Sequence, residues 1–225
     1  MIAPAPQLMP SKAEIIQRLT NPGIIAVVRA QSREQVLPLS EALIAGGVVA
    51  IEITMTTPGA IEAIREAHRE LGTRGLIGVG TVLDTDTCQA ALDAGAQYVV
   101  SPITRTALIG VAHAAGNPIM LGACTPTEAQ LAHEAGADFI KIFPADGPGP
   151  NYIKALRAPL PHLRIVPTGG VDLNTANDFL KAGCVALGVG SSLVSAKILQ
   201  DRNWPELTRL AGEFVKIVQS FRAKI

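Results

Sequence analysis

An Ala-Gly step recurs along the chain, each time between an alanine-rich helical pattern and a short apolar run. The five steps are Ala45-Gly46, Ala94-Gly95, Ala115-Gly116, Ala135-Gly136 and Ala182-Gly183. Glycine accepts the left-handed conformation that ends a helix and lets the chain turn into the next strand. The repeat therefore predicts a fold built from helix, glycine cap and strand in regular succession.

Two further junctions, at residues 72–75 and 159–161, fill the wider gaps in this series. The predicted strands cover residues 24–29, 49–54, 76–80, 97–101, 118–123, 138–143, 163–168 and 185–189. They are continuously apolar, as expected for strands covered on both faces, and the helices between them require parallel pairing. A doubly wound open sheet also alternates strands and helices, but eight units in a chain of 225 residues favour a closed α/β barrel, the (β/α)8 or TIM barrel.

Two helices are expected outside the ring, one at 11–19 covering the bottom of the barrel and one at 204–221 as the last outer helix. The composition is 48% hydrophobic and 17% charged, which suits a well-filled core. We therefore expect residues 1–225 to form one barrel domain with an extra N-terminal helix.

Charge and hydropathy narrow the class of partner. The formal net charge is zero and no block rich in Lys or Arg occurs, so we expect no nucleic acid and no membrane surface as a partner. The chain shows no secretory leader and no run of roughly 18 apolar residues, which predicts a cytoplasmic protein. A small molecule is the expected partner.

The cysteines and histidines predict neither a disulfide framework nor a metal site. Cys88, Cys124 and Cys184 are far apart and form no C-x-x-C motif, and we interpret Cys124, near the end of a strand, as a buried packing residue. The four histidines lie in predicted helices or their flanks, where surface or capping roles are expected. No metal and no cofactor are expected.

Residues at the C-terminal ends of barrel strands are the candidates for chemistry. Lys141 is the one lysine inside an apolar strand and should point into the barrel, with Phe143 ending the same strand. Burial disfavours the charged ammonium and so favours a nucleophilic amine. The alternative is a buried lysine that only forms an ion pair with Glu52.

Glu52 ends another apolar strand, where an unpaired carboxylate would be costly to bury. We interpret it as a general acid and base, with a salt bridge to Arg29 as the alternative. After strands seven and eight, the segments Pro167–Val171 and Gly188–Ser192 have the composition of backbone cradles for phosphate. A helix is expected to begin after Ser191 and to favour the anion further.

With these residues placed, nearly the whole chain resembles the bacterial 2-keto-3-deoxy-6-phosphogluconate (KDPG) aldolases, class I aldolases of the Entner–Doudoroff pathway. The matching segments, in order, are Val27–Ala30, Ala45–Gly47, Ile51–Thr54, Gly78–Val82, Val100–Pro102, Phe139–Ala145, Pro167–Gly170 and Gly188–Ser191.

The resemblance implies a division of labour among the candidates. Lys141 would form an imine with the keto acid, Glu52 would move protons through water, and pyruvate and glyceraldehyde 3-phosphate would leave without the help of a metal. It also implies a homotrimer. The positions that match substrate-binding ones are Thr81 and Pro102 at the pyruvyl end, with Phe143 beside them, and Thr168, Gly169, Gly170, Gly190 and Ser191 at the phosphate.

The chain departs from the family pattern at one place. Many members have an arginine a few residues after the glutamate to bind the substrate carboxylate, but here that stretch reads Thr54-Met-Thr-Thr57. Other members have an arginine at the end of strand one instead, as Arg29 is here. We therefore expect Arg29 to bind the pyruvyl carboxylate through its planar guanidinium.

Three alternatives remain open at this point. The enzyme could also act on 4-hydroxy-2-oxoglutarate, or prefer the galactonate epimer of the substrate, because stereochemistry at C4 depends on side-chain placement. It could be a barrel without catalytic activity that serves in assembly or binds a phosphorylated ligand. It could also be another phosphate-binding isomerase or synthase in which the lysine acts only through its charge.

Overall fold

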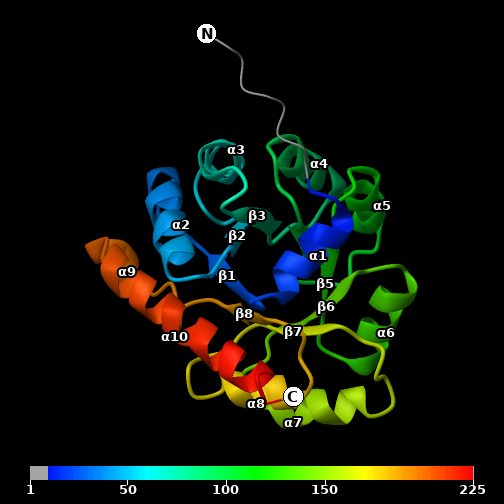
Figure 1. Cartoon of the computed structure of the whole chain (residues 1–225). Helices are drawn as coiled ribbons and strands as arrows, with labels where there is room; N and C mark the ends of the chain where they lie inside the picture. Colours follow the sequence, from blue (N-terminus) through cyan, green and yellow to red (C-terminus); the bar gives the residue numbers. More distant parts are fainter. Residues whose placement is uncertain (1–9, 225) are drawn as a thin grey trace.

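Eight parallel strands, each followed by a helix, form the centre of the molecule (Figure 1). The computed structural model describes residues 10–224; residues 1–9, on which part of the leader prediction falls, and residue 225 lie outside it. The strands are β1 (Ile24–Val28), β2 (Ala50–Thr54), β3 (Leu76–Gly80), β4 (Val99–Val100), β5 (Ile119–Ala123), β6 (Phe139–Ile142), β7 (Ile165–Pro167) and β8 (Leu187–Val189).

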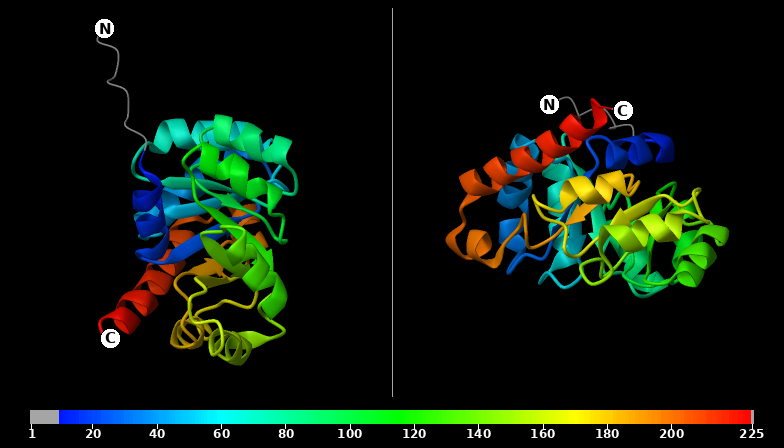
Figure 2. Two further views of the ribbon diagram at one scale, coloured as in Figure 1. Left: turned by 90° about the vertical axis from the view of Figure 1, so that its right-hand side faces the viewer. Right: turned by 90° about the horizontal axis from the view of Figure 1, so that it is seen from below.

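The helices surround the strands in chain order, as Figure 1 shows. α10 packs against α2 and α8 along one side of the barrel (Figure 2). The helices are α1 (Lys12–Thr20), α2 (Val36–Ala45), α3 (Ala60–Leu71), α4 (Thr85–Asp93), α5 (Ala107–Ala114), α6 (Pro126–Glu134), α7 (Gly149–Arg157), α8 (Ala176–Lys181), α9 (Ala196–Asp201) and α10 (Trp204–Arg222), with a short 3-10 helix η1 (Arg33–Gln35) before α2.

Strand pairing confirms the predicted closed barrel. The strands are hydrogen-bonded in the order β7-β6-β5-β4-β3-β2-β1-β8, every pair parallel. The ends of this series, β7 and β8, are joined by one isolated parallel bridge between Thr168 and Gly188. A side chain at Gly188 would collide with the Thr168 hydroxyl, so glycine is what allows the two strands to meet there.

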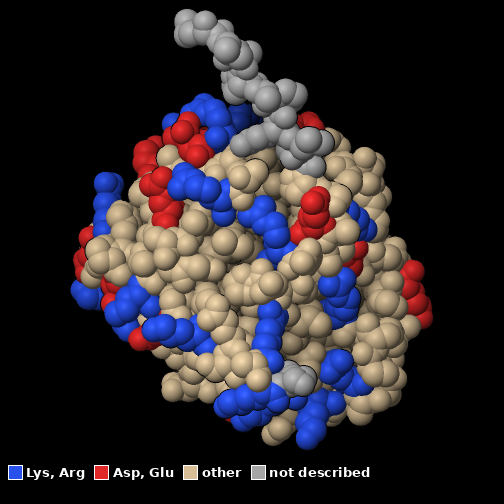
Figure 3. Space-filling model, viewed as in Figure 1, with Lys and Arg blue, Asp and Glu red and all other residues tan. Residues whose placement is uncertain are grey.

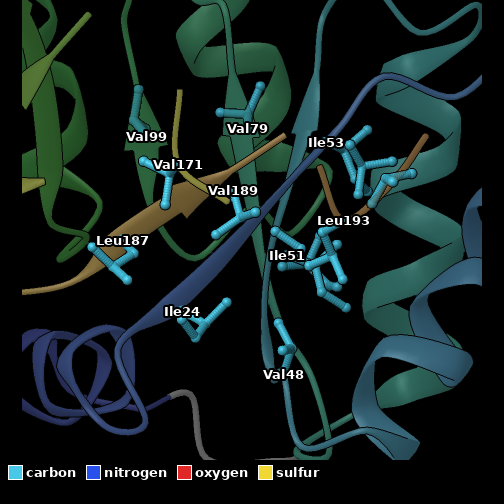
Figure 4. Packing of buried hydrophobic residues seen from close by; sticks show 14 of the residues in the cluster. Ile24, Val48, Ile51, Ile53, Val79, Val99, Val171, Leu187, Val189 and Leu193 are labelled. Atoms are coloured by element: carbon cyan, nitrogen blue, oxygen red, sulfur yellow. The ribbon is translucent and has the colours of Figure 1, made fainter. Parts of the chain in front are cut away.

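Alternate residues of the strands pack on opposite sides of the barrel wall. One set, which includes Ile51, Ile53 and Val79, packs in the layer between the strands and the helices (Figure 4). The other set lies inside the barrel, where Tyr98 and Phe139 belong to a second apolar cluster. This division explains the continuous apolar strands, because both faces of each strand are buried.

α1 covers one end of the barrel, as predicted from residues 11–19 (Figure 1). Ser11 and Glu14 form a reciprocal capping box at its start, and its buried Ile15 and Leu19 join the inner apolar cluster. The Lys12 amine lies 2.8 Å from Asp138 Oδ1, just before β6. These contacts close the barrel end opposite to the strands' C-termini.

Three details differ from the sequence-based expectation. β4 covers two residues rather than 97–101, and the helix after β8 begins at Ala196, capped by Ser195, rather than directly after Ser191. At Ala45-Gly46 the left-handed residue is Gly47, with φ of 90°, whereas Gly46 is right-handed. A side chain at Gly46 would instead collide with Ala211 of α10, so this glycine serves close helix packing.

The end of the barrel that α1 covers has basic side chains throughout and acidic ones mainly toward its upper half (Figure 3). Between residues 10 and 224, none of the helices is both long enough and apolar enough to cross a membrane.

Candidate active site

Lys141 and Glu52 meet inside the barrel from opposite walls. Lys141 lies in β6 and Glu52 in β2, and the Lys141 Nζ is 3.5 Å from the Glu52 Oε1. Only 6% of the lysine side chain and 3% of the glutamate side chain are exposed. The Nζ also lies 5.3 Å from the centre of the Phe143 ring, within the usual range of a cation–π contact. An amine and a carboxylate are therefore held together in a largely dry interior.

Glycine in β3 makes the space for the carboxylate. A β-carbon added at Gly80 would lie 2.6 Å from both the Cγ and the Cδ of Glu52, closer than any real contact. Gly122, which pairs in register with Lys141, gives similar room to the backbone of Pro102. The missing side chain of Gly80 thus leaves room for the Glu52 carboxylate, and that of Gly122 lets the loop after β4 approach β5 closely.

Tyr98 lies in the barrel interior beside this pair. Its ring contacts Gly78, the register partner of Glu52 in β3, and the residue is 1% exposed. Within residues 10–224 its hydroxyl has no hydrogen-bond partner. Burial, and in addition the negative charge of Glu52, raise the pKa of Tyr98 well above its usual value, so the phenol stays neutral.

Arg29 follows β1 at the C-terminal end of the barrel and is exposed. Its Nε donates a hydrogen bond to the Thr56 Oγ1 at 3.0 Å. The alternative in which Glu52 forms a salt bridge with Arg29 is therefore wrong for this structure, because the carboxylate faces Lys141 across the barrel. Arg29 is turned toward the loop after β2 instead.

A cavity of about 350 Å³ opens beside Arg29, between the loops that follow β7 and β8. It brings together seven of the predicted site residues from four different strand ends. Those seven are Arg29, Phe143, Thr168, Gly169, Gly170, Gly190 and Ser191.

The loops at this cavity present backbone amides in fixed positions. Gly169 and Gly170 have φ of 92° and 67°, a left-handed conformation that suits glycine. The Thr175 hydroxyl donates to the carbonyl of Gly170 at 2.7 Å, and the amide of Val194 donates to the carbonyl of Gly190 at 2.9 Å. Within the described chain, the amides of Gly170 and Ser191 donate no hydrogen bond. Such amides suit an anionic ligand.

Thr81 and Pro102 do not line this cavity. Both follow strands on the other side of the barrel mouth, Thr81 directly after Gly80 and Pro102 with its backbone against Gly122. Thr81 has φ of 63°, a left-handed conformation unusual for a β-branched residue. These two predicted site residues therefore lie apart from the loops that follow β7 and β8.

The cysteines divide into two kinds. Cys88 and Cys184 are buried, and burial raises the pKa of their thiols to about 11 and about 12, respectively. Cys124 is exposed at the end of β5, so its interpretation as a buried packing residue is wrong. Among residues 10–224, no group of three or more His, Cys, Asp or Glu side chains is arranged to hold a metal ion.

Comparison with known proteins identifies the family. The family profile described as KDPG and KHG aldolase matches residues 15–210. The chain belongs to this aldolase family. It is therefore an enzyme of the lyase class that acts on a carbon–carbon bond.

Individual relatives agree with this assignment over most of the aldolase. The 2-dehydro-3-deoxy-phosphogluconate aldolase of Pseudomonas aeruginosa is 38% identical over 84% of this chain and 86% of the relative. The 2-dehydro-3-deoxy-6-phosphogalactonate aldolase of Escherichia coli is 36% identical over 89% and 97%. The KDPG aldolase of Legionella pneumophila, whose structure holds pyruvate as a covalent carbinolamine, is 28% identical, covers 88% and 96%, and has a TM-score of 0.82.

The sequence reasoning missed a contact at the barrel mouth of this aldolase. Thr54 was a candidate only as a strand-end residue and Thr56 was noted only in the stretch that lacks an arginine, yet the hydroxyl of Thr56 accepts a hydrogen bond from Arg29. Their spacing of two, at the end of a strand and in the turn that follows it, could have indicated that the two hydroxyls lie close together.

Proposed function

We propose that this enzyme is a class I aldolase in which Lys141 forms a Schiff base with the C2 carbonyl of KDPG. The observation that supports the proposal most strongly is the buried pair of Lys141 and Glu52, with Nζ and Oε1 3.5 Å apart. An amine needs a base to lose its proton before it attacks, and the Glu52 carboxylate is in direct contact with it.

The reaction can be written with Lys141 forming the covalent bond and Glu52 moving the protons. The neutral Lys141 amine adds to C2, and the carbinolamine loses water to give a protonated imine. Removal of the proton from the C4 hydroxyl then breaks the C3–C4 bond, releasing glyceraldehyde 3-phosphate while the imine nitrogen accepts the electron pair as an enamine. Protonation at C3 and hydrolysis release pyruvate and restore Lys141. Glu52, working through water, supplies and removes these protons.

The remaining residues would hold the substrate at its two ends. Arg29 would bind the pyruvyl carboxylate, and Thr81, Pro102 and Phe143 would border the pyruvyl group. The loops after β7 and β8 would bind the phosphate through their amides and hydroxyls, as left-handed glycine turns commonly do. The residues of this phosphate site are Thr168, Gly169, Gly170, Gly190 and Ser191.

Borohydride trapping tests the central step. Reduction in the presence of pyruvate should add one pyruvyl group to Lys141, located by mass mapping of peptides. Lys141→Arg should abolish the adduct, whereas Lys154→Arg on the surface of α7 should leave it unchanged. An unmodified Lys141, together with no aldehyde release from KDPG, would exclude the aldolase mechanism and favour a barrel that only binds a phosphorylated ligand.

Substrate preference is a separate question. Because the pyruvyl half is common to KDPG, its galactonate epimer and 4-hydroxy-2-oxoglutarate, all three fit the chemistry of Lys141. The cavity beside the β7 and β8 loops favours a phosphorylated substrate. Measuring kcat/KM for both epimers and for the unphosphorylated acid would establish the substrate preference. A kcat/KM for the unphosphorylated acid equal to that for the phosphorylated substrates would contradict the phosphate site.

We also propose a cytoplasmic homotrimer, as the resemblance to the family implies. The exposed apolar side chains of Leu83, Ile103 and Leu131 are compatible with a surface covered by another subunit. Light scattering after gel filtration should give three times the chain mass of 23.5 kDa. A monomeric mass at micromolar concentration would contradict the trimer.

A further inference from the structure

A chain of three hydrogen bonds runs from the barrel wall to the guanidinium of Arg29. The Thr54 Oγ1 donates a buried hydrogen bond to the carbonyl oxygen of Val28 at 3.0 Å. The hydroxyls of Thr54 and Thr56 are 2.8 Å apart. The Arg29 Nε donates to the Thr56 Oγ1 at 3.0 Å. The chain therefore connects a buried carbonyl of β1 to an exposed side chain at the barrel mouth.

The direction of every proton in this chain is determined. A threonine hydroxyl has one proton. Because the proton of Thr54 goes to the Val28 carbonyl, the proton between the two hydroxyls must belong to Thr56. Thr56 then has only lone pairs left to offer, and the Arg29 Nε, which can only donate, meets one of them. The Thr56 hydroxyl is thus oriented as an acceptor for Arg29 before any ligand arrives.

This contact decides which edge of the guanidinium remains for a ligand. Arg29 can bind a carboxylate bidentately either through Nε and one terminal amino group or through its two terminal amino groups. The bond to Thr56 occupies Nε, so the two terminal amino groups are the pair that remains. They belong to a side chain that lines the cavity between the strand ends.

We propose that Thr56, with Thr54 behind it, is a positioning residue that fixes Arg29 for end-on binding of the substrate carboxylate. The proposal rests on the proposed role of Arg29. In place of the arginine that many relatives have in this stretch, the loop supplies an acceptor that orients an arginine from the neighbouring strand. Restricting the side chain before binding reduces the entropy lost when the carboxylate binds.

The position of the β1 loop does not depend on Thr56. Thr57 is buried, and its hydroxyl accepts a hydrogen bond from the amide of Ala30 at 3.1 Å. The backbone after Arg29 is therefore anchored by a different threonine. Replacing Thr56 with Val keeps the shape of the side chain and the Thr57 anchor, and it removes the acceptor for Arg29 together with the hydrogen bond to Thr54 behind it.

Steady-state kinetics with KDPG can separate a positioning role from a structural one. Thr56→Val should raise KM about three- to tenfold with kcat nearly unchanged, as expected for loss of one partly exposed hydrogen bond. Thr56→Ser should restore the parent KM, because it keeps the acceptor. Thr208→Val, which removes a hydroxyl bonded to the Ala42 carbonyl on the outer helices, is the matched control and should change neither constant.

The double variant gives the decisive result. Arg29→Ala should raise KM strongly, and adding Thr56→Val to it should raise KM no further, because Thr56 acts through Arg29. If Thr56→Val multiplies KM by the same factor in both backgrounds, or if Thr56→Ser is as impaired as Thr56→Val, the positioning role is wrong while the role of Arg29 stands. An unchanged KM for Thr56→Val would have the same meaning. An unchanged KM for Arg29→Ala would overturn both.

Discussion

Gly80→Ala tests whether the position of the Glu52 carboxylate sets the rate of catalysis. The variant adds one methyl group on β3, and the backbone can accept it because Gly80 does not have a positive φ. The methyl carbon would lie 2.6 Å from the Cγ and Cδ of Glu52. Since carbon atoms in contact are normally about 3.5–4.0 Å apart, the glutamate side chain must move by roughly 1 Å.

A displacement of that size can be converted into a rate. A misplacement of about 1 Å in an active site can cost about 100-fold in turnover, and we expect kcat of Gly80→Ala to fall by about this factor. KM should change little, because Arg29 and the loops at the cavity are not touched. The crowding itself should cost about 1–3 kcal/mol of the free energy of unfolding.

The measurement is the release of pyruvate from KDPG, coupled to its reduction by NADH, with thermal unfolding recorded for every variant. Gly110→Ala adds the same methyl group to the exposed face of α5, where no heavy atom lies within 4 Å, and is the control. It should keep full activity and gain about 0.5–1 kcal/mol of stability. A folded Gly80→Ala with kcat within threefold of the parent would refute the reasoning.

Three further predictions concern stability. Tyr98→Phe removes a buried hydroxyl without a partner in the described residues, so the free energy of unfolding in urea should stay equal or rise by up to about 1 kcal/mol, and a clear loss would contradict this. Ser195→Ala removes the side-chain cap of α9 and should cost about 1 kcal/mol in the same assay. Burial lowers the pKa of His68 below its usual 6.5, so the neutral ring contributes its full stability above pH 6.5, and this is lost as the pH falls through the lowered folded value. His68→Gln should flatten the decline of the urea midpoint on acidification, and an equally steep decline would exclude His68 as its cause.

The positions of the strands could be predicted because they depend on local signals. Strands covered on both faces are continuously apolar, and glycine at the helix ends separates them, so all eight predicted strands overlap observed ones, and five of them agree to within one residue at each end. Lys141 was predictable for the same reason, as the one lysine within such a strand. β4 covers only two residues, although the amide of Gln97 before it donates to the Ile77 carbonyl and the amide of Ser101 after it donates to the Met120 carbonyl.

The partners of the site residues could not be predicted in the same way. Glu52 could reach either Arg29 or Lys141 in a sequence-based scheme, and the choice depends on side-chain directions across the barrel. The space left by Gly80 fixes the carboxylate, and the acceptor on Thr56 turns Arg29 away from it. The space beside Gly80 and the orientation of the Thr56 hydroxyl depend on contacts between strands that are distant in the sequence, so the sequence alone does not show them.

The single bridge between Thr168 and Gly188 that closes the barrel has a consequence for the energetics of binding. The loops proposed to hold phosphate leave β7 and β8 directly beyond that bridge, one on each side. A phosphate bound between the two loops would bridge β7 and β8 beside their single backbone contact. Its binding energy would then oppose the local separation of these two strands. The amide hydrogens of β7 and β8 should then exchange with solvent more slowly in a buffer that contains inorganic phosphate than in a buffer of equal ionic strength without phosphate or sulfate. Occupancy of the phosphate end would be recorded in the backbone itself, without any turnover.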